Sequence, residues 1–307
     1  MLPKISKEDE KIIAKILRLK KEKDALILAH NYQEYGIYRI ADSIGDSFEL
    51  SKIASKTDKN LIVFCGVKFM AETAKILSPQ KTVLLPDISA GCTLVKNGDV
   101  DEVRKLKEKH PDAALVTYVN SSAELKAISA ACCTSANAIG IVNSIECEKI
   151  IFAPDQNLGK YVQKHSDKKI ILADNFCSVH THISKKSIDD LKKQHPNAKV
   201  VAHPECTPDV LDICDEVAST KGMLDYCKTF QDQEFIIATE QNMLNRLILE
   251  CPGNTYINAG GVCEGMQKIT LAKVLDALEN EKYSISIDET IMKNAKKALD
   301  KMLEISK

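Results

Sequence analysis

Short apolar segments that end in polar residues recur along the chain and alternate with stretches of helical hydrophobic spacing. Three of the apolar segments, DALILAHNY (24–32), DAALVTYVN (112–120) and NAKVVAHPE (197–205), align at offsets of 88 and 85 residues. A second strand pattern follows each of them in the same register. Repetition at a nearly constant period predicts three copies of one structural unit.

The helical stretches include YRIADSIGDSFELSKIAS, TPDVLDICDEV and MLNRLIL. Apolar strands that alternate with helices predict parallel sheets covered on both faces. We therefore predict an α/β fold of three pseudo-threefold-related αβα units with short parallel sheets. The predicted units are 1–92, 93–177 and 178–263, and the helical tail 264–307 is expected to dock on the first.

Composition and charge favour a small-molecule partner. The 307 residues carry a net charge of −1 with no basic stripe, Trp is absent, and aromatic residues make up 5%, so we expect no nucleic-acid binding. No apolar run is long enough to span a membrane, and the N-terminus is typical of an amphipathic helix, so a cytoplasmic protein is expected. In a reducing compartment the 11 cysteines are expected to be thiols, metal ligands or catalysts rather than disulfides.

Three cysteines follow the third recurring strand of each unit. Cys92, Cys177 and Cys263 are separated by 85 and 86 residues, close to the repeat length. A threefold arrangement of the units would bring these thiolates together. Thiolates hold iron–sulfur clusters, and three ligands on a cluster of four irons leave one iron open as a Lewis acid. The alternative is that all three are ordinary buried core cysteines.

The ends of the first strands carry pairs of polar residues at alternate positions, which share one face of a strand. These pairs are His30 with Tyr32, Tyr118 with Asn120, and His203 with Glu205. They supply acid–base groups and hydrogen-bond donors to a common cavity, although each alone is compatible with an ordinary core or surface side chain.

Three hydroxyl residues, Ser47, Ser135 and Thr220, align at the same offsets, each just before a helical pattern. They are interpreted as helix N-caps, and the helix N-terminus beside each can also bind phosphate or carboxylate. His180 lies three residues after Cys177 and is expected to face the same cavity.

The chain as a whole resembles the quinolinate synthase family. The motifs that carry the resemblance occur in the family's order from residue 29 to residue 271: AHNYQ, GDSFELS, FMAETAKIL, TYVNSSAE, CCTSANA, PDQNLGKYV, CSVH, HPEC, ATE and CEGMQKITL. The resemblance implies a triangle of three αβα domains around one 4Fe-4S cluster. It also implies a transferase of NAD biosynthesis that condenses iminoaspartate with dihydroxyacetone phosphate to quinolinate, phosphate and water. An L-aspartate oxidase or aspartate dehydrogenase is the expected functional partner.

By matched motif, the resemblance implies Cys92, Cys177 and Cys263 as the cluster ligands. It further implies Tyr32, Glu205, His203 and His180 as catalytic groups. The substrate-binding residues it implies are His30, Ser47, Tyr118, Asn120, Ser135 and Thr220. Lys68, Ser178 and Gln267 depart from residues common in the family, and none of them is one of these site residues.

Two other classes of function stay open. An iron–sulfur sensor would use the same cysteines but would need a DNA-binding or partner surface. A metal-free, cysteine-dependent enzyme would need one activated thiol with its base, whereas the chain offers three equivalent cysteines.

Overall fold

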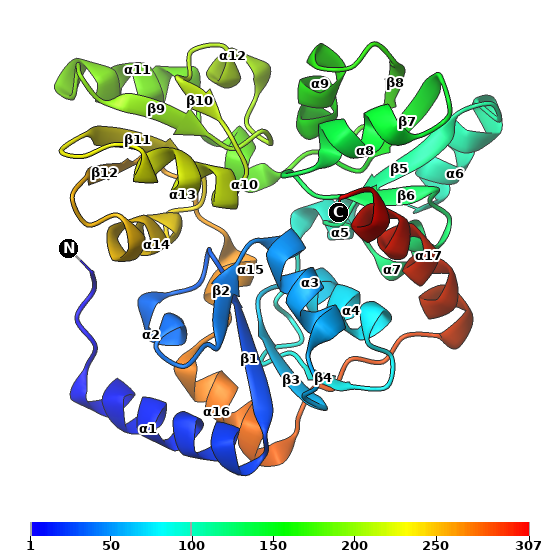
Figure 1. The fold of residues 1–307 in the computed structure, drawn as a ribbon. Coiled ribbons are helices and arrows are strands. Elements are labelled where there is room, and N and C mark those ends of the chain that lie inside the picture. Colours follow the sequence, from blue (N-terminus) through cyan, green and yellow to red (C-terminus); the bar gives the residue numbers. More distant parts are fainter. Residues whose placement is uncertain (1, 99, 307) are drawn as a thin grey trace.

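The computed structural model describes residues 2–98 and 100–306, which form three lobes arranged as a triangle (Figure 1). Each lobe is built on a four-stranded sheet in which every strand pair is parallel. The predicted α/β fold of three αβα units is therefore confirmed. No helix among the described residues is long and apolar enough to cross a membrane.

The first sheet has the order β2-β1-β3-β4. Its strands are β1 (Ala25–His30), β2 (Ser43–Gly45), β3 (Leu61–Cys65) and β4 (Thr82–Leu84). The helices of this part of the chain are α1 (Lys7–Glu22), α2 (Tyr35–Tyr38), α3 (Ser47–Lys56) and α4 (Lys68–Leu77).

The second sheet repeats this topology as β6-β5-β7-β8. Its strands are β5 (Ala114–Tyr118), β6 (Ala131–Cys133), β7 (Lys149–Ala153) and β8 (Lys169–Leu172). The accompanying helices are α5 (Thr93–Asn97), α6 (Val100–Lys109), α7 (Ala123–Ala127), α8 (Ala138–Ser144) and α9 (Gln156–Lys164).

The third sheet follows the same plan as β10-β9-β11-β12. Its strands are β9 (Lys199–Ala202), β10 (Glu216–Val217), β11 (Glu234–Ala238) and β12 (Thr255–Asn258). Its helices are α10 (Ser178–Thr181), α11 (Lys185–Gln194), α12 (Pro208–Leu211), α13 (Thr220–Lys228), α14 (Met243–Glu250) and α15 (Glu264–Gln267).

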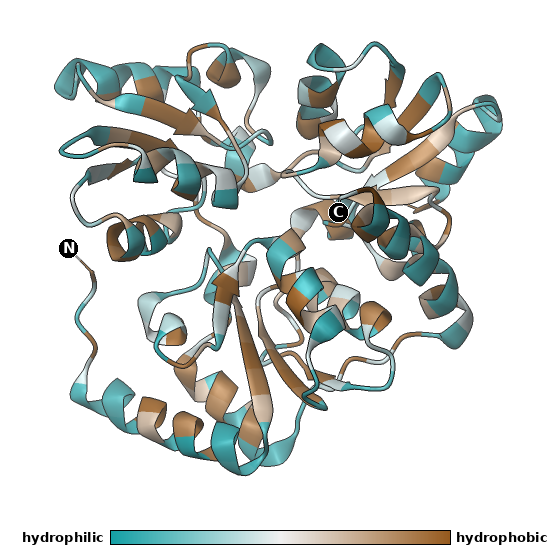
Figure 2. Ribbon diagram, in the orientation of Figure 1, coloured by the Kyte–Doolittle hydropathy of each residue, from teal (hydrophilic) through white to brown (hydrophobic). Residues whose placement is uncertain are grey.

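Burial explains why the central strands are nearly continuous apolar runs. In β3, β7 and β11 every residue after the first is buried, because helices cover both faces of each sheet. Figure 2 shows the same division, with hydrophobic strands inside and hydrophilic helix surfaces outside. The carboxyl ends of the strands are directed towards the middle of the triangle, which is where a parallel sheet binds its ligands.

The two C-terminal helices dock on different units. Helix α16 (Leu271–Asn280) packs against α1 and β3 of the first unit, as expected. Helix α17 (Glu289–Ile305) packs mainly against α7 and β6 of the second unit and also touches α4. The expectation that the whole tail docks on the first unit is therefore wrong for α17. The buried face of α17 contains Ala295, Ala298, Leu299 and Met302. The boundaries of the three units stay a prediction.

Candidate active site and metal centre

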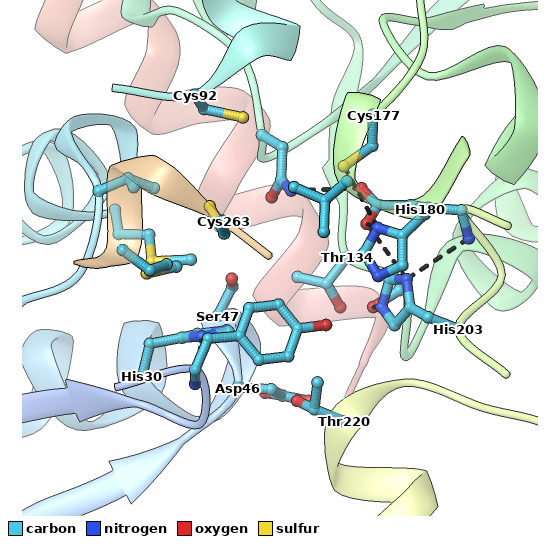
Figure 3. Close-up of a pocket in the computed structure, with 18 of the residues that line it drawn as sticks. His30, Asp46, Ser47, Cys92, Thr134, Cys177, His180, His203, Thr220 and Cys263 are labelled. Carbon is cyan, nitrogen blue, oxygen red and sulfur yellow. Dashed lines mark hydrogen bonds and ion pairs between the residues drawn. The ribbon is translucent and has the colours of Figure 1, made fainter. Parts of the chain in front are cut away.

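A single cavity lies where the three units meet (Figure 3). The predicted site residues all line it: His30, Tyr32, Ser47, Cys92, Tyr118, Asn120, Ser135, Cys177, His180, His203, Glu205, Thr220 and Cys263. In Figure 3 the sulfurs of the three cysteines lie on one side of this space, and Asp46 and Thr220 lie on the other. The structure thus brings the predicted residues together, whereas their individual roles stay predictions.

The strand-end pairs of the first and third units have the same local geometry. His30 ends β1, and its Nδ1 accepts a hydrogen bond from the backbone N–H of Tyr32 at 3.1 Å. His203 follows β9, and its Nδ1 lies 3.4 Å from the backbone nitrogen of Glu205, again two residues later. In both units the histidine contacts the backbone two residues later, at a residue that lines the cavity.

Glu205 is the centre of a buried polar network. Its Oε2 atom lies 2.8 Å from Nδ1 of His180 and 3.1 Å from Nδ1 of His203. Its Oε1 atom accepts a hydrogen bond of 3.4 Å from the Asn120 side chain. Burial alone would raise the pKa of Glu205, but the two neighbouring imidazoles lower it below its ordinary value. The carboxylate is therefore held in its charged form, in which it accepts hydrogen bonds from these neighbours.

Tyr32 reaches the same network from the first unit. Its hydroxyl lies 2.5 Å from Oγ1 of Thr239, and this Oγ1 lies 2.9 Å from Nε2 of His180. Burial raises the pKa of Tyr32 well above its ordinary value, and the negative charge of Glu205 raises it further. Tyr32 is thus a neutral phenol that can donate a hydrogen bond.

The three cysteines have equivalent positions, each immediately before a short helix. Cys92 precedes α5, Cys177 precedes α10 and Cys263 precedes α15. Burial raises the pKa of Cys92 to about 12 and that of Cys263 to about 11. Burial likewise raises the pKa of Cys177 well above its ordinary value. A bound cation reverses this preference, because its charge stabilises the thiolates, so metal binding would release protons.

The space around the cysteines fits a bulky group. Cys92, Cys177 and Cys263 line both the central cavity and a second, outer groove, so the three thiols lie between two hollows. Among the described residues, one group of three possible ligands has all its ligand atoms within 4.8 Å of one another, namely Cys177, His180 and Glu205. The three cysteines do not form such a group. They are spread too widely for one zinc ion, whose bonds to sulfur are about 2.3 Å long.

Two buried carboxylates beside the cysteine loops are not in the set of predicted site residues. Asp155 follows β7, and its Oδ2 accepts from the backbone N–H of Cys177 at 2.9 Å. Glu240 follows β11. Burial raises the pKa of its carboxyl to about 8, and hydrogen bonds from the backbone N–H groups of Asn242 and Cys263 oppose this rise. At the repeat offsets, Asp155 and Glu240 occupy equivalent positions in the second and third units, and Val67 occupies that position in the first. This register is the sequence signal that points to them.

Glycines permit the close approach of the cysteine loops. A Cβ atom on Gly265 would lie 2.0 Å from the backbone oxygen of Gly91, so the Cys92 and Cys263 loops meet only because residue 265 is glycine. A Cβ on Gly261 would lie 2.4 Å from the backbone oxygen of Thr239. The chain before Cys263 therefore packs directly on the end of β11.

The predicted N-caps need a correction. Asp46, not Ser47, caps α3, since its side chain accepts from the N–H groups of Phe48 and Glu49. Ser219, not Thr220, caps α13, and Ser135 lies two residues before the N-cap of α8. Because the neighbouring residue satisfies the helix end, the hydroxyls of Ser47 and Thr220 are left beside the cavity.

The three departures from the family pattern lie outside the residues that line the cavity. Lys68 is exposed, with its Nζ 3.7 Å from a carboxylate oxygen of Glu72. The Ser178 hydroxyl lies 3.1 Å from that of Thr93, and Gln267 is half-buried on α15. They therefore leave the wall of the cavity unchanged.

Comparison with known proteins agrees with this geometry. A sequence model of the family described as "Quinolinate synthetase A protein" matches residues 14–304. The chain belongs to this family. It is 46% identical over 301 residues to quinolinate synthase 2 of Methanosarcina acetivorans, covering 97% of each chain. It is also 49% identical over 293 residues to quinolinate synthase of Caldicellulosiruptor bescii, covering 94% of this chain and 97% of that one. With quinolinate synthase of Thermodesulfovibrio yellowstonii the identity is 48% over 296 residues, covering 95% and 98%.

Proposed function

We propose that the protein is a quinolinate synthase, a transferase that condenses iminoaspartate with dihydroxyacetone phosphate to quinolinate, phosphate and water. The observation that carries the proposal is the meeting, in one cavity between three units, of every side chain that the family's motifs imply. The near full-length identity to named quinolinate synthases supports the same activity.

The proposed cofactor is one 4Fe-4S cluster held by Cys92, Cys177 and Cys263. Three equivalent thiols between two hollows support a group larger than one ion. When bound, the cluster supplies an iron without a protein ligand, which can act as a Lewis acid towards a substrate oxygen.

The side chains of the cavity have complementary proposed roles. Glu205 and Tyr32 exchange protons with substrate during the dehydrations, because one is a charged carboxylate and the other a neutral phenol. His203 and His180 hold Glu205 from two sides and act as its hydrogen-bond partners.

The remaining lining residues are proposed to bind the substrates. His30, Tyr118, Asn120, Ser47, Ser135 and Thr220 offer hydrogen bonds around the cavity. Ser47 and Thr220 stand in the first turns of α3 and α13, where the helix dipole favours anions. Two carboxylates and one phosphate of the substrates would bind at such positions. An L-aspartate oxidase or aspartate dehydrogenase would supply the iminoaspartate in the cytoplasm.

An anaerobic assay tests the activity. Iron-loaded protein is incubated with dihydroxyacetone phosphate and iminoaspartate generated enzymatically, and quinolinate is measured by mass spectrometry. The proposal predicts quinolinate that depends on both substrates. Absence of product from iron-loaded protein would refute it.

Iron content tests the ligand set separately. The wild-type protein should hold about four irons per chain. Cys92→Ser, Cys177→Ser and Cys263→Ser should lose most of this iron, while the matched control Cys147→Ser, at a half-buried cysteine outside the cavity, should keep it. A single ion on Cys177, His180 and Glu205 would instead leave the Cys92 and Cys263 variants fully loaded.

A further inference from the structure

Thr239 connects two parts of the active site that come from different units. It follows β11, is fully buried, and contacts both Tyr32 of the first unit and His180 of the third through its single hydroxyl. At the repeat offsets, the residues equivalent to Thr239 are Gly66 in the first unit and Pro154 in the second. Neither of these has a side-chain hydroxyl, so the connection breaks the threefold pattern and exists in the third unit alone.

The contacts of His180 favour one direction for these hydrogen bonds. Nδ1 of His180 faces a Glu205 carboxylate oxygen at 2.8 Å and the Cys177 sulfur at 3.2 Å. A carboxylate is an acceptor only, so Nδ1 carries the proton that faces it, and in the tautomer protonated on Nδ1 alone Nε2 is an acceptor. In that tautomer Thr239 donates its one hydroxyl proton to Nε2. Its oxygen is left to accept from the Tyr32 hydroxyl.

We infer that Thr239 is a positioning residue whose hydroxyl holds the Tyr32 phenol and the His180 imidazole in one directed chain, Tyr32 to Thr239 to His180 to Glu205. The inference rests on the proposed function, in which Tyr32 and Glu205 handle protons. Thr239 is not among the residues that line the cavity. Its effect is to set where the phenolic proton points and to hold the His180 ring at its Nε2 atom before substrate enters.

Two substitutions separate this role from simple packing. Thr239→Val keeps the branched shape but removes the hydroxyl, so the Tyr32 hydroxyl and Nε2 of His180 lose this partner at a buried site. Thr239→Ser keeps the hydroxyl and loses only a methyl group. If Thr239 acted by packing alone, the serine variant would be the more damaged of the two.

The kinetic experiment compares the two variants with the wild type, all loaded with iron under anaerobic conditions. We expect Thr239→Val to lower kcat by about 10-fold or more with little change in KM, and Thr239→Ser to stay within about 3-fold of the wild type. Equal kcat in the valine variant and the wild type would overturn the inference while leaving the proposed function intact. An inactive wild type would instead refute the proposed function.

A second measurement needs neither iron nor turnover. The ring nitrogens of 15N-histidine-labelled, metal-free protein are recorded by NMR, and the signals of His180 are assigned by their loss in His180→Gln. The wild type and Thr239→Ser should show His180 protonated on Nδ1 with Nε2 hydrogen-bonded. In Thr239→Val the Nε2 signal should shift as its donor is lost. Unchanged His180 signals in a folded valine variant, as judged by circular dichroism, would contradict the proposed chain.

Discussion

Asp155 joins the end of β7 to the loop of Cys177, and Asp155→Asn tests that connection. The Oδ1 atom of Asp155 accepts from the N–H groups of Asn157 at 2.9 Å and Leu158 at 2.8 Å, which caps α9. The Oδ2 atom accepts from the N–H of Cys177 at 2.9 Å. An asparagine keeps one oxygen for the cap and places an NH₂ group against the Cys177 N–H. The substitution therefore removes the link to the cysteine loop and spares the helix.

The expected cost follows from that single lost acceptor. A buried N–H without a partner costs about 1–3 kcal/mol. Burial and the nearby charge of Glu205 raise the pKa of Asp155, so removing its negative charge offsets part of this cost and points to the lower end of the range. Asp155→Ala also loses the cap, which adds about 0.5–2 kcal/mol. A loosened Cys177 loop should weaken iron retention about 10-fold or more, as other residues that support metal ligands do.

Urea unfolding of the metal-free protein and iron loss to a chelator measure the two effects. Asp288→Asn is the matched control, because Asp288 caps α17 through Oδ1 bonds to Thr290 and Ile291 at 2.9 and 3.0 Å and is exposed. We expect the control to change the free energy of unfolding by less than about 0.5 kcal/mol. If Asp155→Asn matched this control in both stability and iron retention, the reasoning about the Cys177 loop would be refuted.

Two further substitutions probe the cavity wall and the meeting of the cysteine loops. Burial raises the pKa of the Asp46 carboxyl from 3.8 to about 6. The folded protein therefore binds the carboxyl proton more tightly than the unfolded chain does. The free energy of unfolding falls for this reason as the pH rises from about 4 to about 6. Asp46→Asn keeps both cap bonds, because these use Oδ1 alone. Its free energy of unfolding should exceed that of the wild type by an amount that grows between pH 4 and pH 7 to at most about 3 kcal/mol. A difference in urea unfolding that does not depend on pH would contradict this. Gly265→Ala should separate the Cys92 and Cys263 loops and lower iron retention, while the control Gly140→Ala, with open space around its Cβ, should retain iron and gain about 0.5–1 kcal/mol in α8. Full iron retention in Gly265→Ala would show that these loops tolerate the shift.

The sequence alone predicted the three repeats and the convergence of the cysteines, because both follow from the order of strands, helices and loops along the chain. An apolar strand, a helix and a loop recur in each unit, and parallel sheets bring the ends of their strands to one edge, so residues at matching strand ends meet. That reasoning predicted the three-unit fold and the convergence of Cys92, Cys177 and Cys263. The strand-end pairs were predictable for the same reason.

Contacts between units follow a different rule, since they depend on the shape of surfaces that only the folded chain brings together. Spacing gave no sign that α17 would lie on α7, because the amphipathic face of a helix does not specify its partner. Two predicted helix caps, at Ser47 and Thr220, were wrong by one residue, and the third was wrong by two. Asp46 and Ser47 are both good capping residues, and the backbone decides between them. The hydroxyl of Thr239 meets Tyr32, 207 residues away in the chain, and no local pattern marks that contact. Periodicity thus predicted which strand ends share the cavity, and tertiary packing decided which of their atoms touch.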